Sequence, residues 1–146
     1  MGQLLLGEFE HTIDDKGRIT VPAKFRGRLA AGLVVTKGID PCLWLFPMDV
    51  WENLSEDIRK LPLTDPRARE FRRQLFGTAS DSVPDKQGRV ILPPYLRGYA
   101  GIDGQAVIIG LHDHCEIWNP ELWRERQERS DGNPDARAEQ FANLGI

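Results

Sequence analysis

Two arginines, Arg18 and Arg89, end two short loops that read Asp-Asp-Lys-Gly-Arg and Asp-Lys-Gln-Gly-Arg. A guanidinium group can donate two parallel hydrogen bonds to O6 and N7 of guanine, or it can bind a phosphate. The aspartate that begins each loop, Asp14 or Asp85, has the wrong charge to bind DNA itself. We therefore expect each aspartate to hold its arginine in one rotamer across the turn, which reduces the entropy lost on binding.

Other residues in and after the loops extend this candidate site. Lys16 and Lys86 are flexible point charges at the loop tips, where they suit phosphate contacts. A glycine in each loop supplies the positive φ that a tight turn requires. The predicted DNA contacts are Arg18, Arg89, Lys16, Lys86, Lys24, Arg26 and Arg97, and the predicted loop-orienting residues are Asp14, Asp85, Gly17 and Gly88.

A simpler interpretation is that each aspartate and arginine only closes a turn. Such a surface salt bridge stabilises a protein by about 0–1 kcal/mol, and Asp, Lys and Gly are common turn residues. The loop occurs twice, however, and residues 16–28 and 86–102 contain cations but no acidic residue. These two features favour binding to an anion, and a two-stranded β-ribbon is one of the few elements that fit the DNA major groove.

The loops belong to a longer internal repeat, in which residues 14–27 recur as residues 85–98 at an offset of 71 positions. In the first copy, alternating apolar residues before the loop and β-branched residues after it predict a β-hairpin, followed by a short helix opened by Pro22. One copy, of about 45 residues, is too small to bury its own core. We expect the copies to pack face to face, burying Phe9, Ile13, Ile19, Val21, Val90 and Leu92.

The predicted fold class is α+β, mainly β, with two ββα-type units that form an intrachain pseudo-dimeric β-barrel with flanking helices. Helices are predicted after Pro47 and Asn119, and over residues 64–77, where a capping residue, a proline and a glycine mark the ends. The expected parts are a first DNA-binding unit (7–49), a helical connector (50–77), a second DNA-binding unit (78–121) and a C-terminal helix and tail (122–146).

From Gly7-Glu8-Phe9 to about Arg124, the sequence resembles the MraZ family. The most specific features are the two Asp-x-x-x-Arg loops, each followed by a hydrophobic triplet and a proline. The resemblance implies two tandem AbrB-like units of the swapped-hairpin class. It also implies a transcriptional regulator that binds short repeated promoter boxes upstream of cell-division and cell-wall genes, its own included, and that assembles as a ring-like homo-oligomer. Pro84 stands where the first copy has Ile13, so the two loops need not contact DNA identically.

The 146-residue chain has a formal net charge of −3 and a sequence pI near 5.6, the wrong sign for bulk attraction to DNA. Several subunits that bind repeated boxes together would compensate for this charge, which favours a homo-oligomer on double-stranded promoter DNA. Residues 1–6 lack an export signal, and no apolar run approaches the roughly 18 residues that span a membrane. We therefore expect a cytoplasmic, nucleoid-associated protein with no membrane partner.

Other functions have weaker support in the sequence. No catalytic or nucleotide-binding motif is present, so we expect neither an enzyme nor a cofactor, whereas a deep pocket with a shifted carboxylate at the loops would indicate a small barrel enzyme. His112-Asp113-His114-Cys115 has metal-ligand residue types, but on a strand Cys115 points away from both histidines, and no metal is predicted. A third alternative is an oligomeric protein-interaction scaffold with the acidic tail as its docking site.

Overall fold

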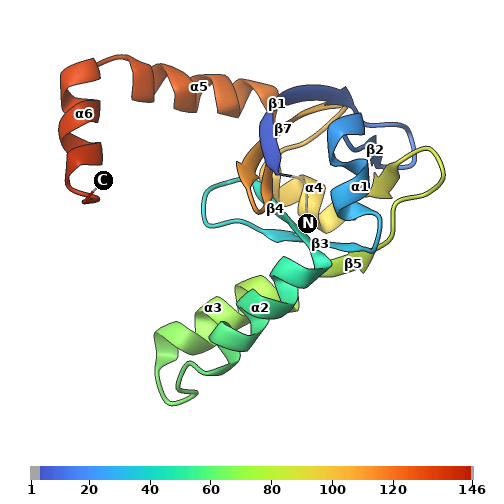
Figure 1. The fold of residues 1–146 in the computed structure, drawn as a ribbon, viewed down its shortest axis with the longest axis horizontal. Helices are drawn as coiled ribbons and strands as arrows, with labels where there is room; N and C mark the ends of the chain where they lie inside the picture. Colours follow the sequence, from blue (N-terminus) through green and yellow to red (C-terminus); the bar gives the residue numbers. More distant parts are fainter. Residues whose placement is uncertain (1–3, 146) are drawn as a thin grey trace.

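The computed structural model describes residues 4–145. Residues 1–3, at the start of the segment that lacks an export signal, and Ile146, at the end of the predicted tail, lie outside the described residues. The first unit contains β1 (Leu5–Thr12), β2 (Arg18–Thr20), η1 (Ala23–Phe25), α1 (Arg26–Leu29), β3 (Leu33–Lys37) and β4 (Leu43–Pro47) (Figure 1). Helices α2 (Met48–Arg59) and α3 (Pro66–Gly77) follow. The second unit contains β5 (Ser80–Ser82), β6 (Arg89–Ile91), α4 (Pro94–Ala100), β7 (Gln105–His112) and β8 (Cys115–Trp118), and the chain ends with α5 (Pro120–Asp131) and α6 (Pro134–Ala142).

The strands of the two units interleave. The main sheet has six antiparallel strands in the order β1-β7-β8-β4-β3-β5, and β2 pairs with β6 in a separate two-stranded sheet. The order is symmetric between the two units. If β1 is exchanged with β5, β3 with β7 and β4 with β8, the same order is obtained, read from the opposite edge. The structure therefore confirms two tandem units in a mixed α/β fold, each of which lends a strand to the sheet of the other.

The local hairpin expected before and after the first loop is wrong. Strand β1 pairs with β7 of the second unit along its whole length, from Leu5 opposite His112 to Thr12 opposite Gln105. Its connection to the chain after the loop is a single bridge between Ile13 and Ile19. Both β1 and β7 have eight residues, whereas β2 has three, so β7 can satisfy the backbone donors and acceptors along one edge of β1.

The closed barrel is also not observed. In the described part of the chain, the six-stranded sheet is open, with β1 and β5 at its two edges. The second edge is short because β5 ends at Ser82, and Pro84 has no N–H with which to extend the ladder. Strands β2 and β6 form a separate sheet, and their buried residues Ile19 and Val90 share one hydrophobic core with residues of the main sheet.

The hydrophobic core contains side chains from both units. Of the residues expected there, Ile13, Ile19, Val21, Val90 and Leu92 are buried, and Phe9 is partly buried and packs edge-on against the ring of Phe25 at 5.3 Å between centroids. Fully burying one such aliphatic side chain contributes about 1.5–3 kcal/mol. Because these contributions are shared, neither unit encloses a complete core by itself.

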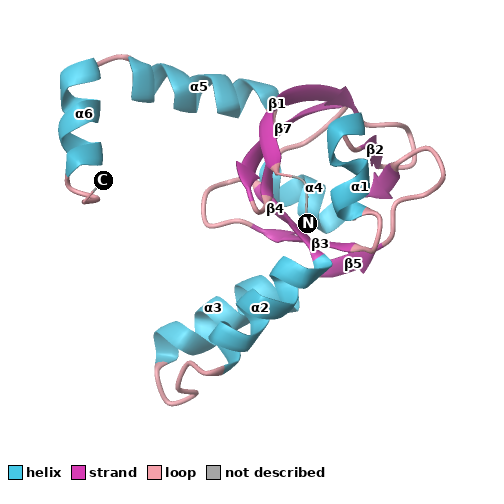
Figure 2. Ribbon diagram, viewed as in Figure 1, coloured by secondary structure: helices cyan, strands magenta, loops and turns pink. Residues whose placement is uncertain are grey.

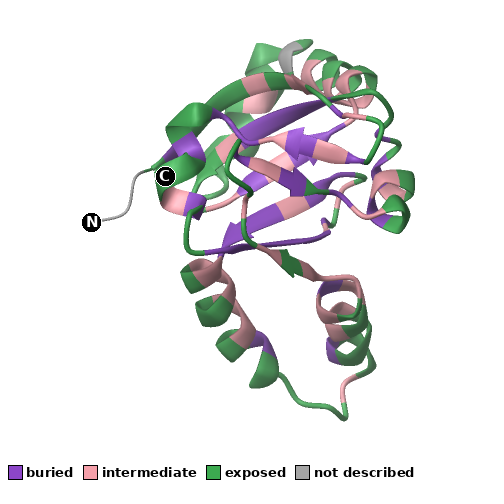
Figure 3. Ribbon diagram, turned by 90° about the vertical axis from the view of Figure 1, so that its right-hand side faces the viewer, coloured by how far each residue is buried: buried purple, intermediate pink, exposed green. Residues whose placement is uncertain are grey.

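Helices α2 and α3 form a hairpin that projects from the body (Figures 1 and 2). As the sequence predicts, α3 begins at Pro66, where the side chain of Asp65 accepts a hydrogen bond from the N–H of Arg67, and it ends at Gly77. Its last turn is anchored because the buried hydroxyl of Thr36 donates to the carbonyl of Leu75 at 2.6 Å. Figure 3 shows that most of the remaining hairpin surface is exposed or half-buried.

The C-terminal helices α5 and α6 form an arm that leaves the body in another direction (Figure 1). Asn119 caps α5 by accepting hydrogen bonds from the N–H groups of Glu121 and Leu122, as the sequence predicts. Helix α6 has no buried residue. None of the helices within residues 4–145 is both long enough and apolar enough to cross a bilayer.

The pairing of β1 with β7 predicts the effect of a change at Gly110. A Cβ atom there would lie 2.6 Å from the carbonyl carbon of Leu5, so Gly110→Ala should force the strands apart and lower the free energy of unfolding by about 1–3 kcal/mol. Gly98, inside α4, has open space around it, and Gly98→Ala should raise that free energy by about 0.5–1 kcal/mol. Urea denaturation measures both, and equal effects would contradict the pairing.

Candidate nucleic-acid interface

The carboxylate of Asp14 organises the first loop. Its Oδ1 accepts hydrogen bonds from the N–H of Lys16 at 3.0 Å and the N–H of Arg18 at 2.8 Å. Its Oδ2 accepts a hydrogen bond from Nε of Arg18 at 2.7 Å, so one carboxylate fixes both the turn and the guanidinium. Gly17, with φ of 78°, completes the turn by donating its N–H to the carbonyl of Asp14.

The second loop has the same construction. Asp85 Oδ1 accepts from the N–H groups of Gln87 and Arg89 at 2.9 and 2.8 Å, and Oδ2 accepts from Nε of Arg89 at 2.8 Å. Gly88 has φ of 77° and donates to the carbonyl of Asp85. Each aspartate therefore lies where the sequence predicts, beside the arginine four positions later, while the role of the pair in DNA binding stays a prediction.

Hydrogen bonding keeps both loop carboxylates ionised. The backbone N–H of Arg18 lowers the pKa of Asp14 most, and the Arg18 guanidinium and the N–H of Lys16 lower it further. The same three kinds of contact, from Arg89 and Gln87, lower the pKa of Asp85. Both turns are consequently held by a charged carboxylate over the whole physiological pH range.

Arg18 and Arg89 lie on one face of the short ribbon formed by β2 and β6. In this ribbon Ile19 pairs with Val90, and both point into the core. Since side chains alternate along a strand, the outward face carries the other four residues, in the pairs Arg18 opposite Ile91 and Thr20 opposite Arg89. The arginine side chains retain 25% and 30% exposure there, and this face is open to solvent.

The two loops are joined across the units. The N–H of Val21 donates to the carbonyl of Gly88, and the N–H of Leu92 donates to the carbonyl of Gly17, each at 2.8 Å. Each turn glycine also packs against an arginine of the other unit, Gly17 against Arg97 and Gly88 against Arg26. Packing thus brings these two predicted DNA contacts to the loop of the opposite unit.

The lysines of the predicted site are less symmetric than the arginines. Lys16 and Lys86 are both exposed, but they are not equivalent: Lys16 corresponds to Gln87, and Lys86 to Asp15. The amide oxygen of Gln87 accepts a further hydrogen bond from Nη2 of Arg89 at 3.2 Å. Lys24 is exposed and lies over the ring of Phe9, 5.8 Å from its centroid.

Sequence reasoning missed two members of this surface, Thr20 and Ile91, which share the outward face of the ribbon with the arginines. Each stands two positions after a loop arginine, and Ile91 is 58% exposed. The sequence did contain the information needed to place them. Successive side chains of a strand point to opposite faces, so burial of Ile19 or Val90 turns the residues on either side of it outward. Reading Ile91 as part of an apolar triplet concealed that alternation.

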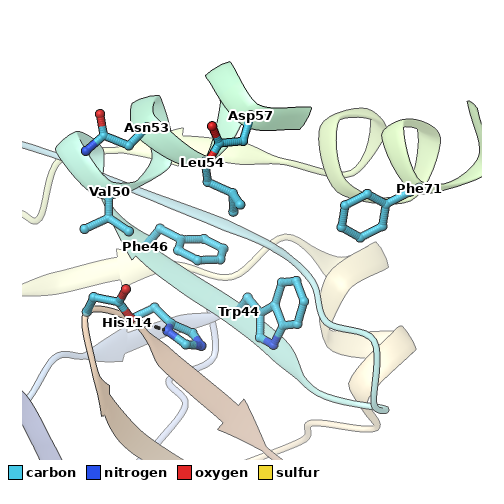
Figure 4. Close-up of a pocket in the computed structure, with 9 residues that line it drawn as sticks. Trp44, Phe46, Val50, Asn53, Leu54, Asp57, Phe71 and His114 are labelled. Atoms are coloured by element: carbon cyan, nitrogen blue, oxygen red, sulfur yellow. Dashed lines mark hydrogen bonds and ion pairs between the residues drawn. The ribbon is translucent and has the colours of Figure 1, made fainter. Parts of the chain in front are cut away.

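An apolar hollow lies beside helices α2 and α3 (Figure 4). This groove, of about 520 Å³, is bounded by α2, α3, β4 and the β7–β8 turn, and Trp44, Phe46, Leu54 and Phe71 supply most of its apolar wall. None of its lining residues belongs to either loop. At the loops themselves, the side chains of Asp14 and Asp85 retain 32% and 37% exposure, and each is bound to the arginine of its own turn.

The segment with metal-ligand residue types forms the β7–β8 turn. His114 Nδ1 and Asp113 Oδ1 lie 2.8 Å apart, and the ring of His114 stacks on Phe46. Cys115 is buried, and burial raises the pKa of its thiol to about 12. Within residues 4–145, no cluster of three or more histidine, cysteine or acidic side chains could hold a metal ion.

Comparison with known proteins agrees with the duplication. A sequence model of the family described as "MraZ protein, putative antitoxin-like" matches residues 4–74 and again residues 75–142. A protein of Herpetosiphon aurantiacus named "Transcriptional regulator MraZ" is 49% identical over 143 residues, covering 98% of this chain and 100% of the relative. Proteins of the same name from Thermomicrobium roseum and Desulfitobacterium hafniense are 45% and 44% identical, covering 97% and 98% of this chain and 99% and 100% of the relatives.

The loop hydrogen bonds predict a pH dependence. Because the pKa of Asp14 and of Asp85 is lowered in the folded protein, their contribution to stability is complete above about pH 4 and is lost as pH falls through the lowered pKa. NMR titration of the side-chain carboxyls should give both midpoints below the ordinary aspartate value. Arg18→Met keeps the backbone N–H and removes the guanidinium, so the midpoint of Asp14 should rise only part of the way, while Asp85 serves as the unchanged control. An unchanged Asp14 midpoint would contradict the ion pair.

Proposed function

Because the chain belongs to the MraZ family, we propose that it is a DNA-binding transcriptional regulator whose β2–β6 ribbon enters the major groove. The relatives named above carry the name of transcriptional regulators. The observation that supports the proposal most is the outward face of the ribbon, where two arginines, each held by an ionised aspartate, stand beside exposed cations. A two-stranded ribbon fits the major groove, and a guanidinium held in place can bind guanine O6 and N7.

In this proposal the predicted site residues have different tasks. Arg18 and Arg89 contact bases, while Lys16, Lys86, Lys24, Arg26 and Arg97 contact the phosphate backbone. The net charge of −3 is compatible with these tasks, because the excess acids lie after residue 115, in the β8 strand and the C-terminal arm. The DNA sites are proposed to be short repeated promoter boxes upstream of cell-division and cell-wall genes, including the gene that encodes this chain.

We further propose that the chain acts as a ring-like homo-oligomer. One subunit neutralises at most the five phosphates assigned above, so it releases few counterions and binds weakly, with a salt dependence of only about −0.9 in log affinity per phosphate. Subunits that bind adjacent boxes together raise the effective affinity without new contacts. The groove beside α2 and α3 is an apolar surface that a second copy would cover, and its rim carries Asp57 and Asp113, whereas the outer face of α3 carries four arginines: Arg67, Arg69, Arg72 and Arg73.

Replacing either ribbon arginine tests the DNA-binding proposal. A guanidinium–base contact contributes about 1–3 kcal/mol, so Arg18→Ala or Arg89→Ala should weaken binding by about 5- to 150-fold per subunit, and more in an assembly. A gel shift at low salt, with duplex DNA from upstream of the encoding gene, measures this. Arg129→Ala changes an exposed arginine on α5, outside both the ribbon and the groove, and this matched control should bind normally. Failure of the wild-type protein to bind would favour the scaffold alternative.

Assembly is tested by a change inside the groove. Leu54→Asp places a charge on the apolar wall and should lower the mass in light scattering toward the 16.5 kDa of one chain. Leu63→Asp makes the same substitution at an exposed residue outside the groove, and it should leave the mass unchanged. Thermal unfolding of both variants shows whether each subunit is still folded, and an unchanged mass for folded Leu54→Asp would contradict this contact.

A further inference from the structure

Ile91 is the apolar member of the outward ribbon face. It pairs with Arg18 across the ribbon and is 58% exposed, while the neighbouring pair of Ile19 and Val90 is buried. The alternation of the strand dictates that position 91 points outward, but it does not dictate an apolar residue there. At the equivalent position of the first unit the chain has Thr20, a residue of similar strand preference with a polar group.

The register determines what Ile91 would meet on DNA. Paired side chains on one face of an antiparallel ribbon have Cβ atoms about 4.5–5.5 Å apart, and successive bases of one strand are about 3.4 Å apart along the helix axis. A ribbon that brings Arg18 to a base edge therefore brings Ile91 to an adjacent base pair. Most groups that bases present in the major groove are hydrogen-bond donors or acceptors, and the apolar group among them is the 5-methyl of thymine.

We propose that Ile91 determines specificity by packing against the 5-methyl group of a thymine next to the base pair that Arg18 binds. This inference rests on the proposed function and adds a residue to its site. The same contact would explain why this outward position carries an apolar residue, because an aliphatic side chain between arginines gains from burial only when an apolar group of the ligand covers it. Thr20 offers a hydroxyl beside its methyl, so the two arms of the ribbon do not discriminate equally.

A thermodynamic cycle tests the contact. The probe is the duplex DNA from upstream of the encoding gene that the wild-type protein binds in the gel shift. In this DNA each thymine is replaced in turn by deoxyuridine, which lacks only the 5-methyl group. At one position per box, deoxyuridine should weaken binding of the wild-type protein by about fourfold per contact, the effect of removing one buried methyl group. Ile91→Ala should weaken binding to thymine DNA by a similar factor and lose the sensitivity to deoxyuridine at that position.

Ile39→Ala is the matched control, since Ile39 is an isoleucine with 68% exposure between β3 and β4, outside the ribbon. It should keep both the wild-type affinity and the sensitivity to deoxyuridine. If the effects of deoxyuridine and Ile91→Ala simply multiply, or if no thymine position is sensitive in the wild-type protein, Ile91 does not contact a thymine methyl although the protein binds DNA. Absence of binding to any probe instead overturns the proposed function. The measurements on wild-type protein are informative even without a folded Ile91→Ala variant.

Discussion

The candidate site depends on a reciprocal pair of backbone hydrogen bonds between the two repeats. Gly17 accepts from Leu92, and Gly88 accepts from Val21, so each loop is completed by the chain that follows the other loop. The buried pair of Ile19 and Val90 lies between these bonds and ties the ribbon to the shared core. Separate units would leave these acceptors and this apolar surface in water, and the two arginines would lose their common face.

Within that frame, electrostatics act over short distances. Each loop aspartate accepts three hydrogen bonds from its own turn and remains charged, so its arginine is held in place through Nε while the side chain stays about one-quarter exposed, 25% for Arg18 and 30% for Arg89. Because the arginine is already held in place, less conformational entropy is lost when a ligand binds. For a single contact, this saving has a larger effect on affinity than the overall charge of the chain. The acidic arm formed by α5 and α6 leaves the body away from the ribbon (Figure 1), and salt screens the interaction of exposed charges that lie more than about one Debye length apart.

Near-symmetry is itself informative about how the ribbon would work. The backbone, the aspartates, the glycines and the arginines agree between the units, whereas the tips and the positions two residues after each arginine differ. The shared residues form the two turns and the ribbon. The differing residues, among them Thr20 and Ile91, lie on the surface where a ligand would bind. A duplicated unit can diverge at such exposed positions at little cost in stability, because substitutions there leave the core intact.

The sequence by itself determined the repeat, both loops with their paired aspartate and arginine, the caps of α3 and α5, and most of the shared core. These features follow from local rules of turn geometry, capping and alternation, which act within a few residues. Only the tertiary structure decided that β1 pairs with β7, that the main sheet stays open, and that Arg26 and Arg97 reach the loop of the opposite unit. Alternation shows which face of a strand is buried but does not identify the strand it pairs with. Strands β1 and β2 pair with strands about 70 to 107 residues away, where matching length and a shared core decide the pairing.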